Sequence, residues 1–106
     1  MIFRFLRSKY LLPVSFVLAL GNTPSYASDT ANGSKIYSTH CIACHGTSGI
    51  SVMVDTPNFS KGEGLLVPDT SLLFSIKNGK NAMPGYQGIL TDSEILDVIA
   101  YLRTLF

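Results

Sequence analysis

The segment from Ser38 to Gly49, "STHCIACHGTSG", contains both cysteines and both histidines of the chain. Cys41, Cys44 and His45 form the pattern C-x-x-C-H, which is the attachment signature of a c-type haem. Two thiols at this spacing can add to the haem vinyl groups, and the next histidine can bind the iron from one face. The motif therefore predicts one covalently bound haem c, with thioethers at Cys41 and Cys44 and His45 as the proximal iron ligand.

Three other kinds of site use cysteines at a similar spacing. A zinc ion needs four ligands, usually from separated segments, and the two adjacent pairs 40–41 and 44–45 could hardly surround it. A thioredoxin-like pair belongs to a βαβ pattern, which this sequence lacks. A disulfide between Cys41 and Cys44 suits an exported protein, but so small a loop would add little stability. We favour the haem interpretation.

The first 27 residues have the layout of an export signal. Basic residues precede the apolar run 11–20, and Ser25 and Ala27 are small residues of the kind that a signal peptidase recognises. The run is shorter than the roughly 20 residues that cross a bilayer. We expect cleavage after Ala27, and the alternative is an uncleaved anchor that also uses residues 2–6.

Removal of residues 1–27 would leave one soluble domain, 28–106, in the periplasm or an equivalent exported compartment. This domain has 79 residues, with five basic and seven acidic side chains, so its net charge is −2. Nothing in this balance suggests nucleic acid as a partner. A chain of this length builds only a thin core and usually adds a disulfide, a metal or a cofactor.

Short helices must position the motif. Ser28, Asp29 and Thr30 are N-cap candidates for a helix that leads into Cys41. A second helix is expected from Asp69, after Pro68, with Leu72, Leu73 and Ile76 on one side. Gly79 would end it in a left-handed cap.

The last helix is the clearest element. Thr91 and Glu94 predict a capping box, and an apolar stripe continues from Ile95 to Leu105. Residues 46–68 show no sustained period and are expected to form a loop with at most a turn of helix. No strand is indicated, so the sequence predicts a small all-α domain whose long loops need something internal to fold around.

A methionine could fill the other axial position of the iron, where a thioether raises the reduction potential. Met83 is the better candidate because it lies in the irregular loop "NAMPGY", where Pro84 and nearby glycines would let the sulfur point inward. Met53 lies only eight residues after His45, too few to pass around the haem edge, so we interpret it as core filler.

These motifs resemble the small class I cytochromes c. "CIACHG", "MPGY" and a C-terminal helix with "VIAYLR" occur in that family's order and at about its spacings. The resemblance implies a small cytochrome c fold of short helices and long loops around one haem. It implies that Gly33 and Tyr37 of the first helix pack against Tyr101 of the last. It also implies that the Pro57 carbonyl accepts a hydrogen bond from Nδ1 of His45, which would orient the imidazole.

With both axial positions filled, the expected function is an exported electron carrier that meets redox proteins such as a dehydrogenase, oxidase or reductase by transient contact. It would not be an enzyme, although it could be a subunit of a larger oxidoreductase. The rival functions are an open-iron domain for gas sensing or peroxide chemistry and a haem-free thiol–disulfide module. Side chains expected to bury the haem, with Tyr86 from the methionine loop, are Ile36, Phe59, Leu72, Ile76 and Ile99.

Four lysines could surround the exposed haem edge and attract an acidic partner, but we favour scattered, solvated side chains, since the domain is net acidic. His40 is expected to be a surface neighbour of the haem rather than a ligand. The four lysines are Lys35, Lys61, Lys77 and Lys80.

Overall fold

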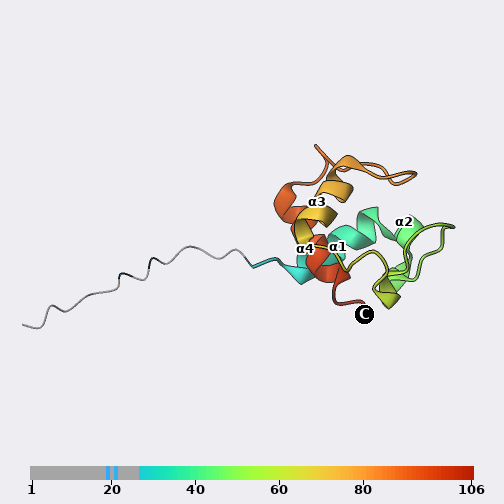
Figure 1. The fold of residues 1–106 in the computed structure, drawn as a ribbon, viewed down its shortest axis with the longest axis horizontal. Helices are drawn as coiled ribbons and strands as arrows, with labels where there is room; N and C mark the ends of the chain where they lie inside the picture. The colour runs from blue at the N-terminus through green and yellow to red at the C-terminus, as the bar shows by residue number, and fades with distance from the viewer. Residues whose placement is uncertain (1–18, 20, 22–26) are drawn as a thin grey trace, which may run out of the picture.

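The computed structural model describes residues 19, 21 and 27–106 (Figure 1). The predicted signal peptide therefore lies almost wholly outside the described residues, and its cleavage stays a prediction. In chain order the helices are α1 (Thr30–His40), α2 (Ile42–His45), α3 (Asp69–Asn78) and α4 (Asp92–Leu102). Two 3₁₀ turns, η1 (Thr47–Gly49) and η2 (Phe59–Lys61), lie between α2 and α3.

The described part of the chain is all-α, as predicted. Its only β-type pairing is two isolated bridges, Lys80 with Met83 and Gln87 with Leu90. Among the described residues, no helix is long and apolar enough to cross a membrane. Both 3₁₀ turns lie in the segment 46–68, which is otherwise a loop, as predicted.

Helix α1 begins at the expected place. Asp29 is the N-cap, and its side chain accepts a hydrogen bond from the Asn32 N–H. The helix ends at His40, and Cys41 is both its C-cap and the N-cap of α2. The C-x-x-C-H motif therefore lies at a break between two helices, and α2 carries His45 in its last turn.

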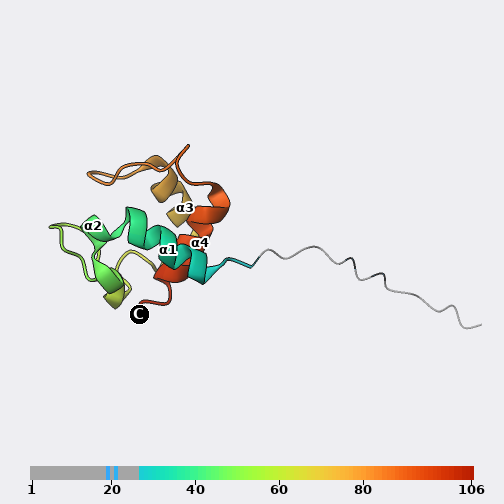
Figure 2. The ribbon, with the colours of Figure 1, turned by 180° about the vertical axis from the view of Figure 1, so that it is seen from behind.

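Helices α1 and α4 pack against each other, and Figures 1 and 2 both show them side by side. Gly33 permits this approach, because an added Cβ would overlap the carbonyl oxygen of Asp97. The rings of Tyr37 and Tyr101 lie with centroids 5.3 Å apart. The packing of Gly33 and Tyr37 against Tyr101 is therefore confirmed. The core formed here and around it consists of Ile36, Tyr37, Phe59, Leu65, Leu90, Ile95, Val98, Ile99 and Leu102.

Asp97 also fixes the beginning of α1. Its carboxylate accepts the Asp29 N–H at 2.7 Å and the Asn32 side-chain amide at 2.9 Å. Asp97 is buried, so these two bonds satisfy a charge that would otherwise be costly to remove from water. The two helices are thus joined by packing in the middle and by hydrogen bonds at the start of α1.

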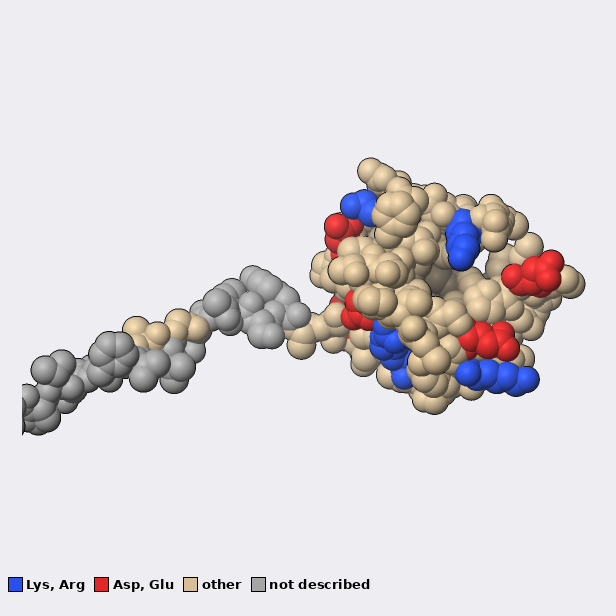
Figure 3. Space-filling view, viewed as in Figure 1, with Lys and Arg blue, Asp and Glu red and all other residues tan. Residues whose placement is uncertain are grey.

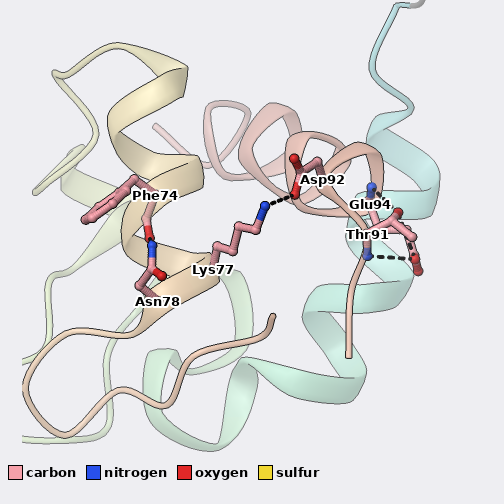
Figure 4. A network of polar contacts seen from close by, with 6 residues as sticks. All are labelled: Phe74, Lys77, Asn78, Thr91, Asp92 and Glu94. Carbon is pink, nitrogen blue, oxygen red and sulfur yellow. Dashed lines mark hydrogen bonds and ion pairs between the residues drawn. The ribbon is translucent and has the colours of Figure 1, made fainter. Parts of the chain in front are cut away.

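Helix α3 lies beside α4, and polar groups connect their ends (Figure 4). Lys77 of α3 pairs with Asp92 in the first turn of α4 at 2.9 Å. The predicted capping box of Thr91 and Glu94 is present, with both reciprocal hydrogen bonds formed. Helix α4 ends at Leu102, so the apolar stripe continues past the helix to a half-buried Leu105.

The end of α3 differs from the prediction. Gly79 has φ 82° and ψ 165°, so it has the positive φ that favours glycine but not the left-handed helical conformation. An added Cβ would lie 2.7 Å from the backbone of both Met83 and Gly85. Close approach of the following loop, rather than a helical cap, therefore explains the glycine at this position.

Arg103, just after α4, fixes the segment before α3. Its guanidinium donates to the carbonyl oxygens of Leu65 at 2.6 Å and Val67 at 2.8 Å. It also donates from two nitrogens to Asp69, at 2.7 and 3.1 Å. Leu65 is fully buried, so this network holds an irregular segment against the core.

Candidate haem site

A cavity of about 920 Å³ lies between the helices and the loops. Its lining combines apolar side chains with the whole predicted ligand set: Cys41, Cys44 and His45 from the motif, Met83 and Tyr86 from the loop after α3, and Pro57 from the loop before η2. The molecular surface is hollowed on the face shown in Figure 3. Segments far apart in sequence thus meet around one space of the size that small ligands and cofactors occupy.

Both cysteines are free thiols and both line the cavity. Cys41 is half-buried, and burial, followed by the charge of Cys44, raises its pKa to about 11. Cys44 is exposed. In the described part of the chain, no group of three or more histidine, cysteine or acidic side chains is arranged to hold a metal ion. The zinc alternative therefore has no support in the structure.

His45 is only 9% exposed. Burial lowers its pKa, which favours the neutral imidazole that can bind a metal. Its ring stacks on Phe59 with centroids 4.6 Å apart and planes inclined by 18°. Phe59 therefore orients the imidazole, a role that the sequence did not reveal because it depends on which aromatic residue the loop brings to α2.

The predicted hydrogen bond from His45 to Pro57 is not formed in this structure. Nδ1 of His45 is buried and has no hydrogen-bond partner. Pro57 lines the same cavity, but the ring plane is fixed by stacking rather than by its carbonyl. An orphaned ring nitrogen is unusual for a buried histidine, since such groups are normally paired. In a histidine that binds a metal through Nε2, the Nδ1–H group usually donates a hydrogen bond to a nearby acceptor.

Met83 lines the cavity and is half-buried. The loop that carries it is fixed to the last turn of α3, because the N–H groups of Tyr86 and Gln87 donate to the carbonyls of Ile76 and Lys77, both at 3.0 Å. Gly85 allows this contact, since an added Cβ would lie 2.8 Å from the backbone of Asn78. Backbone hydrogen bonds therefore hold Met83 at the cavity.

Met53 also lines the cavity, but it is 42% exposed. The interpretation of Met53 as core filler is therefore wrong. It lies in an exposed apolar stretch with Val52 and Val54. Its position gives the molecule a second cavity methionine against which Met83 can be compared experimentally.

Tyr86 connects two parts of the cavity wall. Its hydroxyl donates to the carbonyl oxygen of His40 at 2.9 Å, and its ring meets the exposed imidazole of His40 edge-on at 5.7 Å. Burial, followed by the charges of Cys41 and Cys44, raises the pKa of Tyr86. His40 is a surface residue at the cavity edge, as expected.

The buried wall differs in part from the expected one. Phe59, Leu72, Ile76 and Tyr86 line the cavity, but Ile36 and Ile99 belong to the core without reaching it. Neighbouring positions on a helix point about 100° apart, so Tyr37 and Val98 face the cavity where Ile36 and Ile99 do not. The additional buried apolar lining residues are Tyr37, Leu65, Leu90, Val98 and Leu102.

Charges at the cavity are few. Lys80 lines it, as do Asp55 and Glu63, whereas Lys35 and Lys61 do not and Lys77 pairs with Asp92. Figure 3 shows positive and negative side chains spread over this face rather than gathered by sign. The lysines are scattered, as expected, but Lys77 is ion-paired and Lys80 lies at the cavity, so the interpretation as solvated side chains fits Lys35 and Lys61 best.

Comparison with known proteins assigns the family. Residues 28–102 match the family model described as "Cytochrome C oxidase, cbb3-type, subunit III". Cytochrome c6 of Thermosynechococcus vestitus is 37% identical over 94 residues, covering 84% of this chain and 82% of the relative. Cytochrome c6 of a Nostoc species is 32% identical, with 90% and 87% covered. The chain belongs to the small class I c-type cytochromes.

The fold of this cytochrome agrees with that assignment. The crystal structure of cytochrome c6 from the diatom Phaeodactylum tricornutum matches it with a TM-score of 0.57 and 30% identity, covering 73% of this chain and 93% of the diatom chain. The cofactor of this cytochrome is one covalently bound haem c. The free thiols, the buried imidazole and the largely apolar cavity fit such a group.

Proposed function

We propose that His45 and Met83 are the two axial ligands of the haem iron in this electron-carrying cytochrome, and that Cys41 and Cys44 form the thioethers. The observation that supports the proposal is that all four residues line one shared cavity, although the motif and the loop after α3 are far apart in sequence. When bound, the haem supplies a ferric–ferrous couple that accepts or releases one electron.

The protein's own residues would tune and protect this site. Burial lowers the pKa of His45, which favours its neutral form, and stacking on Phe59 limits the directions its ring can take. Core side chains such as Leu65, Val98 and Leu102 exclude water from one side of the cavity. Excluding water on that side reduces the rearrangement that accompanies a change of charge. Pro57 stays the predicted acceptor for His45 Nδ1 when haem is bound.

The open-iron alternative is less well supported. Peroxide chemistry would be assisted by a histidine or arginine facing the free side of the iron, yet the described cavity lining contains no arginine and no histidine besides His40 and His45. His40 is exposed and next to the attachment motif. A closed His–Met pair leaves the iron no vacant position and limits the reaction to electron transfer.

The site of action and the partners follow from the sequence and the family together. An exported location, in the periplasm or an equivalent compartment, is supported by the signal-like residues 1–27. Redox proteins that meet the cytochrome transiently are the partners that an electron carrier requires. We propose no specific donor or acceptor, since the few charges at the cavity do not select one.

The absorption spectrum of the haem-loaded protein tests the ligands. A weak near-infrared band reports sulfur bound to ferric iron. We expect the wild-type protein to show the band, Met83→Ala to lose it, and Met53→Ala to keep it. Met53 is a matched control because it is a methionine of the same cavity. A band that survives Met83→Ala, or a high-spin wild-type spectrum, would contradict the assignment.

A further inference from the structure

Met83 is the last residue of a tight reverse turn that begins at Lys80. The Lys80 N–H donates to the Met83 carbonyl at 3.1 Å, and the Met83 N–H donates to the Lys80 carbonyl at 3.0 Å. This pair of bonds leaves Asn81 and Ala82 as the two central residues. Because Met83 is the last residue of the turn, the conformation of the two central residues determines the position of its Cα atom and the direction of its Cβ atom.

Asn81 adopts an uncommon backbone conformation. Its φ is +53°, and it is one of only three non-glycine residues with positive φ in the described part of the chain. Ala82 is not among the three, so only the first central residue has positive φ. This pattern is found in two-residue turns that favour glycine, and asparagine next, at that position.

Asn81 also lines the cavity, so its side chain is a second explanation, which the Asn81→Gly variant separates from the backbone conformation. The residue is exposed, and its amide makes no hydrogen bond to another described residue. By contrast, Asn78, three residues earlier in α3, donates from its amide to the Phe74 carbonyl at 2.9 Å, as Figure 4 shows. What distinguishes Asn81 is its positive φ, which is energetically unfavourable for most residues other than glycine and asparagine.

The rest of the loop is fixed independently of this turn. Gly79 and Gly85 lie in close contact, and the N–H groups of Tyr86 and Gln87 are bonded to the end of α3. Both ends of the loop are therefore held by contacts that do not involve the side chains of Asn81 and Ala82. A change in the turn would move Met83 without moving the base of the loop.

We infer that Asn81 is a positioning residue for Met83, acting through its positive φ rather than through its side chain. The inference rests on the proposed function, in which Met83 binds the iron. The turn stabilises the loop conformation in which the sulfur reaches the cavity. Residues that resist positive φ at this position favour conformations in which Met83 is withdrawn and an external ligand can take its place.

The test uses the haem-loaded protein and imidazole as a competing ligand. We expect Asn81→Gly to bind imidazole no more tightly than wild type, Asn81→Ala to bind it more tightly, and Asn81→Val to bind it about tenfold more tightly, the factor that left-handed strain converts to. The near-infrared band should weaken in the same order. Asn78→Ala is the matched control, since it removes the same amide from a helical backbone, and it should behave as wild type.

Two results separate the inference from the proposed function. If the wild-type protein shows the band and Asn81→Val binds imidazole as weakly as wild type, the positioning role is overturned while Met83 stays the ligand. If the wild-type protein lacks the band, both are overturned. Circular dichroism shows whether each variant is folded, and Asn81→Gly keeps the test valid should Asn81→Val fail to fold.

Discussion

The two sides of the haem cavity are held together by different forces. The side that carries His45 is attached to a helical frame, in which α1 and α4 pack through Gly33 and Tyr37. The side that carries Met83 is a loop held by backbone hydrogen bonds to the end of α3. The close contact at Gly33 has no room for a larger side chain. The backbone hydrogen bonds of the loop do not depend on side-chain type, so most substitutions leave them in place. The frame should therefore control stability and the loop should control ligation.

The largest effect is expected at the centre of the frame. Gly33→Val would place its Cβ and methyl groups on the Asp97 carbonyl and force α1 from α4. We expect the free energy of unfolding to fall by about 3 kcal/mol, the upper end of the usual cost of overpacking, because the clash is with backbone. Denaturant unfolding of the haem-loaded protein measures this. Ser34→Ala, the next position along α1, should cost less than about 0.5 kcal/mol. Equal losses at both positions would refute the close-packing explanation.

A buried hydrogen bond in the same frame should give a smaller effect. The Tyr37 hydroxyl donates to the Gly46 carbonyl at 2.6 Å, directly after His45. Tyr37→Phe removes this donor and leaves the Gly46 carbonyl only the longer bond from the Gly49 N–H at 3.3 Å, so we expect a cost of about 1 kcal/mol. Tyr101→Phe makes the same chemical change in the partner ring, whose hydroxyl has no hydrogen bond to another described residue, and should cost less.

The same pair of variants predicts a pH dependence. Burial, followed by the charges of Cys41 and Tyr101, raises the pKa of Tyr37 from 10.0 to about 12. The protonated phenol is therefore favoured by folding, and its contribution is complete below pH 10 and lost as the pH rises towards 12. Unfolding free energy should fall less steeply over this range in Tyr37→Phe than in Tyr101→Phe. Identical slopes would argue against a buried phenol at this position.

The smallest effect is expected where the two sides meet. Tyr86 belongs to the loop, but its hydroxyl donates to the His40 carbonyl at the end of α1. Tyr86→Phe removes one partly exposed hydrogen bond, so we expect a loss of about 0.5 to 1 kcal/mol. Imidazole should also displace Met83 faster, as stopped-flow absorbance would show. If the variant loses stability but imidazole displaces Met83 at the wild-type rate, Tyr86 supports the helical frame and not the loop, which contradicts the proposed division.

The sequence determined the features that depend on neighbouring residues. The motif of Cys41, Cys44 and His45 fixes its own spacing, and Asp29 caps α1 through a bond that spans three residues. The capping box at Thr91 is local in the same way. These elements were predictable because the chemistry needs only residue types at short, fixed separations.

Only the tertiary structure decided which distant groups meet. The ring of His45 stacks on Phe59 and makes no hydrogen bond to Pro57. Arg103 donates hydrogen bonds to carbonyl oxygens of a segment more than 30 residues earlier. The conformation of Gly79 follows from contact with the returning loop rather than from a helical cap. Such contacts depend on how helices and loops pack around the cavity, and no local spacing encodes them. The sequence thus determined what the haem site is made of, and packing decided how each ligand is held.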